Sequence, residues 1–434
     1  MSIPAGYLDE LRTEIERLAV AIVEFLASAP DSEIEAAEHA FAAISKCESG
    51  GGSEHDLHNV IALWTYQQVS AAGDVRPDID IGSLWKRVEE FLEGLAGDIV
   101  HGGVDPAGTI YGFEKYENLD PKWLEYIIGW LEHSPSSGKI ATLPKGGTPF
   151  EMDDEVTIAV VGDWGTGVDY RTQSAGHVAS AIGGCTPDVS IHLGDVYYDG
   201  TTHQQDHKFL GPWKPAKGSL GSFTLNSNHD MYNGANGYLH TLADPMFREQ
   251  RNKTHFVLHN SSWVVVGLDT AGPASWERQY MCGDIDDEQL EFLAGQAKSG
   301  KRLILLTHHQ GIDETTAKYN DPLHTKIVDC VEQNRPGSEP WYWYWGHIHA
   351  GYVHTDEAAP YRGRCAGHGA IPWGNARGLR GLEGIKWYEQ TKSQIGDHRV
   401  TNGFALLTLS GDTLKEQFVD EKGVVSYTIP ENGA

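Results

Sequence analysis

Six short apolar runs in the last two thirds of the chain constrain its fold more than any other feature. They span residues 156–161, 189–193, 223–225, 263–268, 303–307 and 342–345, and helical patterns separate them. Nearly continuous apolar runs of this length are typical of strands that are buried on both faces, as in sheets covered by helices. The pattern therefore predicts an α/β architecture. Two further strands are expected at 403–410 and 413–419.

Polar residues follow five of these runs at the point where each run ends. They are Asp163, Asp195, Asn228 with His229, His308 with His309, and His347 with His349. In open α/β sheets the ligand crevice lies outside the carboxyl ends of the strands, so we expect these five segments to meet in one place. Carboxylate, amide and imidazole groups together suit a divalent or trivalent metal ion.

The spacing inside these segments adds a geometric expectation. His347 and His349 stand two apart, so their imidazoles share a face if the backbone is extended. Asp195 and Tyr198 stand three apart, so a single turn after the strand brings both side chains inward. A carboxylate can bridge two cations, and a phenolate can bind a hard trivalent one. Tyr197 is adjacent, and the sequence leaves open that either tyrosine serves only in packing.

Taken in chain order, these motifs form a series that can be compared with the motifs of known protein families. The series is Gly-Asp163, Gly-Asp195-x-x-Tyr198, Asn228-His229, His308 and His347-x-His349. It resembles the calcineurin-like metallophosphoesterase superfamily, in which the first motif is usually Asp-x-His. Here Gly165 replaces that histidine, and Tyr198 follows the second aspartate, so the pattern is most similar to the purple acid phosphatases. The resemblance covers roughly residues 156–429.

The resemblance implies a ligand set for two metal ions. One ion, typically Fe³⁺, would be held by Asp163, Asp195, Tyr198 and His349. The other ion, typically Fe²⁺, Zn²⁺ or Mn²⁺, would be held by Asp195, Asn228, His308 and His347, with Asp195 as the bridge. A phenolate bond to ferric iron would absorb visible light.

The resemblance also implies residues that face the substrate. Asn228 and His229 would form the catalytic pair, with His229 beside the phosphate, where it protonates the leaving oxygen or orients the ester. His309 is expected to face the substrate or to support a ligand. The alternative is an edge histidine bonded to a carbonyl. Ser227, which stands where glycine is usual, leaves the ligand set intact.

Charge narrows the classes of partner. The chain of 434 residues has 33 basic and 61 acidic side chains, a net charge of −28. Nucleic acids and anionic membranes are bound by basic surfaces, so we expect neither as a partner. The expected partner is a small phosphate ester, with bound metal supplying the positive charge.

Cysteine usage and the distribution of apolar residues suggest the compartment. The five cysteines are widely spaced and odd in number, which is typical of a reducing compartment. There is neither a signal-peptide pattern at the start nor an apolar stretch long enough to span a membrane. We therefore expect a cytoplasmic protein. The oligomeric state stays open.

Periodicity and composition divide the chain into three parts. Residues 1–135 show helical spacing, with helices expected near 8–26, 32–44, 56–72, 84–95 and 121–131. Residues 136–155 are rich in Ser, Gly and Pro, which predicts a linker. Residues 156–430 are expected to form the catalytic domain. The expected architecture is a four-layer α/β/β/α metallophosphoesterase sandwich behind an all-helical N-terminal domain of unknown role, which caps the site, mediates oligomers or binds a partner.

The function that these features favour is hydrolysis of phosphate monoesters by a hydroxide that a dinuclear metal site activates. A phosphodiesterase at the same site is the first alternative. The second is a metal-containing binding or regulatory protein, whose function lies in the helical domain. The third is oxidative chemistry at a redox-active iron.

Overall fold

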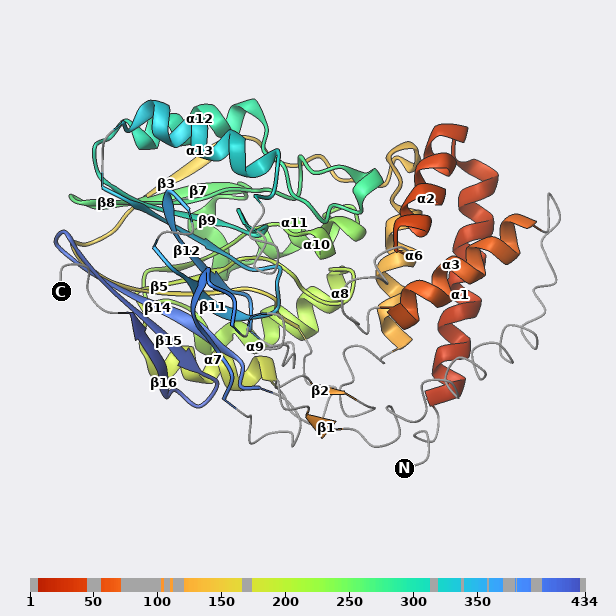
Figure 1. Cartoon of the computed structure of the whole chain (residues 1–434), viewed down its shortest axis with the longest axis horizontal. Coiled ribbons are helices and arrows are strands. Elements are labelled where there is room, and N and C mark those ends of the chain that lie inside the picture. Colours follow the sequence, from red (N-terminus) through yellow and green to blue (C-terminus); the bar gives the residue numbers. More distant parts are fainter. Residues whose placement is uncertain are drawn as a thin grey trace.

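The computed structural model describes residues 7–44, 56–71, 103–104, 110–111, 121–165, 174–312, 319–336, 339–356, 359–369, 379, 381–391 and 400–429. Over these residues the chain forms two packed sheets with helices on both outer faces, and a group of helices lies at one end (Figure 1). The predicted α/β/β/α sandwich with a helical N-terminal region is confirmed. The expected helix at 84–95 lies outside the described residues.

The larger sheet has eight strands. They are β3 (Gly147–Glu151), β7 (His255–His259), β8 (Trp263–Gly267), β9 (Arg302–Thr307), β10 (Trp341–Trp345), β11 (Gly351–His354), β12 (Tyr361–Ala366) and β13 (Ile385–Tyr388). Their order is β13-β11-β12-β10-β9-β8-β7-β3. Strands β8, β9, β10 and β12 are parallel, so β9 and β10 end at the same edge.

The smaller sheet has six strands. They are β4 (Glu155–Val161), β5 (Val189–His192), β6 (Gly221–Thr224), β14 (Gly403–Ser410), β15 (Thr413–Asp420) and β16 (Val425–Ile429). Their order is β16-β15-β14-β4-β5-β6, with β4, β5 and β6 parallel. The loops that follow these three strands therefore leave the sheet at one edge.

Helices cover the outer face of each sheet. The larger sheet carries α12 (Asp287–Ala297) and α13 (Leu323–Asn334), and the smaller carries α7 (Ser174–Gly184), the π-helical η4 (Gln205–Leu210), α9 (Gly211–Trp213) and η5 (Lys214–Ala216). Strand β10 shows why both faces are apolar. Trp343 packs towards α13, whereas the next residue, Tyr344, packs between the sheets, because successive side chains point to opposite faces.

Short helices complete the loops between strands. They are η3 (Pro135–Ser137), α8 (Thr202–Gln204), α10 (Asn228–Tyr232), α11 (Asn236–Leu242), η6 (Pro245–Gln250) and η7 (Trp276–Arg278). Ser227 caps α10, because its hydroxyl accepts a hydrogen bond from the backbone N–H of Asp230. This cap fixes the conformation of the segment that follows β6.

The helical region before the sandwich packs directly onto it. Its helices are α1 (Tyr7–Ser28), α2 (Asp31–Ile44), α3 (Asp56–Ala71), η2 (Pro121–Trp123) and α6 (Leu124–Glu132), with a two-residue strand pair, β1 (Gly103–Val104) and β2 (Ile110–Tyr111). One apolar core joins Ile22, Phe41 and Ile127 of these helices to Met231 and Tyr238 of α10 and α11. A boundary near residue 135 stays a prediction.

The segment expected as a linker contains a strand of the sandwich. Residues 147–151 form β3, which pairs with β7 at the edge of the larger sheet. Pro149 is compatible with an edge strand, since it has no N–H to donate to a further strand. Its composition predicted an extended segment but gave no sign of a pairing partner.

Among the described residues, no helix is both long enough and apolar enough to span a membrane.

A buried ion pair links the two sheets. Arg364 on β12 is 1% exposed, and its Nε donates to Glu416 Oε2 on β15 over 2.9 Å. The hydroxyl of Tyr344 on β10 donates to the same carboxylate oxygen. Charged hydrogen bonds of this kind are geometrically specific, so the pair fixes how the sheets are stacked.

Removing one partner of this pair should destabilise the sandwich. We expect Glu416→Ala to lower the free energy of unfolding by about 3–5 kcal/mol, because Arg364 would remain buried and uncompensated. The double variant Arg364→Met with Glu416→Leu should recover most of that loss. Urea unfolding of the three proteins measures this, and a Glu416→Ala midpoint equal to that of the wild type would contradict it.

Candidate metal centre

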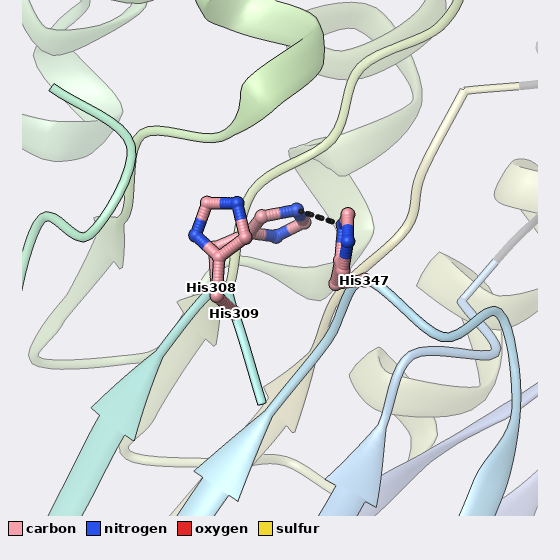
Figure 2. A group of neighbouring side chains, drawn as sticks. All are labelled: His308, His309 and His347. Carbon is pink, nitrogen blue, oxygen red and sulfur yellow. Dashed lines mark hydrogen bonds between the residues drawn. The ribbon is translucent and has the colours of Figure 1, made fainter. Parts of the chain in front are cut away.

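The predicted donor residues lie together where the two sheets meet. Asp163 and Asp195 follow β4 and β5 of the smaller sheet, and Asn228 begins α10 after β6. The histidines follow β9 and β10 of the larger sheet, and Figure 2 shows His308, His309 and His347 side by side beyond the ends of those strands. Both sheets therefore contribute side chains to one buried cluster.

One group of donors surrounds the Nε2 atom of His308. This atom lies 2.8 Å from Asn228 Oδ1, 3.2 Å from His347 Nδ1 and 3.2 Å from Asp195 Oδ1. The four residues are those expected for the second metal ion. Their ligand atoms converge from three loops and one short helix.

Hydrogen bonds outside this group orient its members. His308 Nδ1 donates to the carbonyl of Leu193 over 3.0 Å, which leaves Nε2 to face the cluster. Asn228 Nδ2 lies 3.2 Å from the hydroxyl of Tyr232, so the amide oxygen faces His308. Such outer contacts fix the tautomer and direction of a metal-binding side chain.

A second group of donors surrounds the hydroxyl of Tyr197. This oxygen lies 2.8 Å from Asp195 Oδ2, 3.3 Å from Asp163 Oδ1 and 2.5 Å from His349 Nε2. His349 Nε2 is also 3.6 Å from Asp163 Oδ1. These are the residues expected for the first metal ion, with Tyr197 in the place of Tyr198.

Asp195 belongs to both groups through different oxygens. Its Oδ1 atom faces His308 and its Oδ2 atom faces Tyr197. The side chain is fully buried, and Oδ1 accepts no hydrogen bond within the described part of the chain. A carboxylate whose two oxygens face two donor groups has the geometry of a bridge.

The electrostatics of the cluster call for a cation. Burial and the neighbouring Asp195 carboxylate raise the pKa of Asp163 well above its usual range. Burial also acts to raise the pKa of Asp195, but His308 and the other histidines outweigh it and hold that pKa well below its usual range. Without a cation, the two neighbouring carboxyl groups therefore ionise at widely different pH. A cation would allow both groups to ionise.

The histidines are in the form that binds metals. Burial lowers the pKa of His308, and burial together with His308 lowers the pKa of His347 to about 3. Both imidazoles are therefore neutral at pH 7, and neutral imidazole is the ligand form. Asp163, Asp195 and His308 hold ligand atoms within 4.8 Å of one another, as do His308, His309 and His347. The donor set fits a metal ion.

Four of the predicted ligands have left-handed backbones. Asp163, Asp195, His347 and His349 have φ values of 60°, 70°, 69° and 53°. This conformation is uncommon for residues other than glycine, and such strain is concentrated at functional sites. The two glycines beside Asp163 also allow a close approach, since a Cβ at Gly346 or Gly367 would lie 2.7 or 2.4 Å from Asp163 Oδ2.

The structure places the ring of Tyr198 beside Trp123 and Lys208. The centre of the Tyr198 ring lies 5.0 Å from that of the Trp123 ring, and Lys208 Nζ lies 4.6 Å from the centre of the Tyr198 ring. The neighbouring Tyr197 holds its hydroxyl among the carboxylates instead. Spacing from Asp195 identified this short segment, but the direction of each ring depends on the backbone turn after β5.

His309 is buried beside the cluster with both ring nitrogens engaged. Its Nε2 donates to the carbonyl of Tyr280 over 2.7 Å, and its Nδ1 lies 2.8 Å from the Thr270 hydroxyl. The ring stands beside His347 (Figure 2). These contacts correspond to the alternative expectation, a histidine bonded to a carbonyl.

His229 lies at the start of α10 against the same cluster. Its Nδ1 donates to the carbonyl of Tyr198 over 2.5 Å. Its Nε2 makes no hydrogen bond to any described residue, so this nitrogen is available to a bound ligand. Burial lowers the pKa of His229, and the nearby Asp195 carboxylate only partly offsets this effect.

Two aromatic residues of the helical region reach the site without any signal in the sequence. Trp123 on η2 and Tyr126 on α6 pack their rings against His229, with centroid distances of 5.8 and 6.1 Å. The helical spacing near 121–131 predicted a helix that carries both residues. Nothing in that spacing relates them to a histidine about a hundred positions away.

The solved structures that are similar to this chain include two that span about two thirds of it. No protein-family model and no curated protein matches the sequence. The first structure is GAP50, described as the anchor in the inner membrane complex of Plasmodium, with a TM-score of 0.45 and 15% identity over 64% of this chain and 89% of that one. The second is the purple acid phosphatase PPD1 from yellow lupin (Lupinus luteus) seeds, with a TM-score of 0.47 and 14% identity over 65% of this chain and 55% of that one. Resemblance at this level carries no statement about activity.

The placement of the two tyrosines makes a spectroscopic prediction. If the protein binds ferric iron, a visible band should arise from Tyr197, whose oxygen lies among the ligands. We expect Tyr197→Phe to remove the band and Tyr198→Phe to leave it. Absorption spectra of the iron-loaded proteins at equal iron content measure this, and loss of the band only in Tyr198→Phe would contradict the placement.

Proposed function

We propose that this chain is a hydrolase that cleaves phosphate monoesters at a pair of metal ions, as the purple acid phosphatases do. The observation that carries the proposal is the position of Asp195, whose two oxygens face two separate donor groups. A site for one ion would need only one of these groups. We infer that the two ions share this carboxylate.

The residues assigned to each ion follow from the two donor groups. One ion would be held by Asp163, Asp195, Tyr197 and His349, and the other by Asp195, Asn228, His308 and His347. When bound, a metal pair neutralises the phosphate, stabilises an in-line displacement and lowers the pKa of water. It would also attract a phosphate ester to a chain whose net charge is −28.

His229 is the proposed proton donor to the leaving oxygen. The Tyr198 carbonyl fixes its Nδ1 proton, so Nε2 is the atom that would face the ester. Because burial lowers the pKa of His229, the protonated imidazole is a stronger acid than in water and is populated mainly at acidic pH. A stronger acid transfers its proton more readily to a poor leaving group.

Removing the shared carboxylate charge should empty the site of metal. We expect about two metal ions per chain in the wild type and a large loss in Asp195→Asn, with loss of hydrolysis. Asp244→Asn is the matched control, since Asp244 caps η6 and should leave metal content unchanged. Full metal content in Asp195→Asn would refute the shared-ligand assignment.

The choice of substrate tests the reaction class on the same samples. Hydrolysis of an aryl phosphate by the metal-loaded wild type supports a monoesterase. Preference for a bis-aryl phosphate would instead indicate a phosphodiesterase, which must accommodate a second group on phosphorus. Metal content without turnover of either ester would indicate a binding or regulatory protein.

Loss of the proposed acid should slow turnover and leave the metals in place. We expect His229→Ala to keep its metal content and to lower kcat by about 10²–10⁴-fold, the usual contribution of a positioned acid. His240→Ala is the control, because His240 is an exposed residue paired with Asp206. An unchanged kcat in His229→Ala would remove this role.

A further inference from the structure

The helical N-terminal region contributes two of the rings that enclose His229. Trp123 lies on η2 and Tyr126 on α6, both before the sandwich in the chain. The other two rings belong to the sandwich, with Tyr197 at 4.4 Å and Tyr232 at 5.1 Å from the imidazole centroid. The imidazole is therefore surrounded by four rings from two parts of the chain.

The geometry of these contacts restricts the imidazole. All four rings lie at 57–79° to its plane, so they meet it largely by their edges or present their faces to its edge. The hydrogen bond from Nδ1 to the Tyr198 carbonyl fixes the direction of one ring nitrogen. Trp123 also packs against Tyr197 and Tyr198 at 5.5 and 5.0 Å. The indole of Trp123 thus contacts His229 and both tyrosines of the loop that lies beside it.

Polar contacts hold the segment that carries Trp123. Glu125 Oε2 accepts a hydrogen bond from Gln204 Nε2 over 2.9 Å, and Gln204 Oε1 accepts one from the backbone N–H of Asp199 over 3.0 Å. Asp199 directly follows Tyr198, so these hydrogen bonds connect Glu125 to the loop after β5 that carries Asp195 and Tyr197. Arg17 of α1 lies 3.4 Å from Glu125 on the other side.

A reciprocal pair of indoles fixes the far end of α6. Trp130 Nε1 donates to the carbonyl of Trp276 over 2.9 Å, and Trp276 Nε1 donates to the carbonyl of Trp130 over 3.0 Å. The two rings stack at 4.7 Å. The segment from η2 to α6 is therefore attached to the sandwich at both ends, and Trp123 has a defined position.

We propose that Trp123 is a positioning residue for His229, so that the helical region completes the catalytic site. This inference rests on the proposed function, in which His229 Nε2 protonates the leaving oxygen. Proton transfer requires the donor within hydrogen-bond reach of that oxygen, and small displacements are costly. Trp123 would act by preventing the imidazole from turning away.

The proposal predicts a dependence on the leaving group. An ester with a poor leaving group, such as an alkyl phosphate, needs the proton, whereas 4-nitrophenyl phosphate leaves readily without it. We expect Trp123→Ala to lower kcat on the alkyl ester by on the order of 10–100-fold and to affect the 4-nitrophenyl ester far less. Trp123→Phe retains a ring at this position and should recover most of the loss.

The experiment measures kcat and KM for both esters in five proteins. They are the wild type, Trp123→Ala, Trp123→Phe, His229→Ala and the double variant Trp123→Ala with His229→Ala. Because Trp123 acts only through His229, the double variant should be no slower than His229→Ala. Trp263→Phe is the control for packing, since it alters a fully buried indole of β8 whose ring packs against Tyr342, away from Trp123 and His229.

Three results would overturn the proposal. The first is an equal loss on both esters in Trp123→Ala, as expected of a general structural effect. The second is a double variant whose losses multiply. The third is the same leaving-group profile in Trp263→Phe. If the wild type hydrolyses both esters, these results reject the positioning role alone, whereas a metal-loaded wild type that hydrolyses neither ester rejects the proposed function and this inference together.

Discussion

Two carboxylates that face each other in a buried site are the constraint on which the centre depends. Asp163 and Asp195 lie fully buried among neutral imidazoles, and burying two like charges costs far more than the protein can offset without a counter-charge. A metal ion bound between them would supply that counter-charge. His308 and Tyr197 contact different oxygens of Asp195, so donor groups stand on both sides of this carboxylate.

The sandwich meets this constraint by dividing the donors between its sheets. The carboxylates come from loops of the smaller sheet, and His308 and His347 come from loops of the larger one. Their relative position therefore depends on how the sheets stack, which the Arg364–Glu416 pair helps to fix. Strained backbone at the ligands is maintained because a strand precedes each of these loops.

The helical region contributes side chains that lie against the residues of the candidate site. Its apolar core continues into the sandwich at Met231, and Trp123 lies against the imidazole of His229. Rings of this kind restrict a side chain without forming hydrogen bonds, so they position a group and leave its nitrogen free. In the proposed function, the helical region would therefore contribute to the site through ring contacts alone.

The sequence by itself determined the strands that carry the donors, since buried strands need apolar runs and ligands need particular side chains. It predicted that Asp195 and His308 follow strand ends that meet in one place, whereas the stacking of two separate sheets decided how they come together. Only the tertiary structure decided that Tyr197 turns inward, that 147–151 joins a sheet and that Trp123 reaches His229. These outcomes depend on backbone turns and on contacts between distant segments, which no local spacing records.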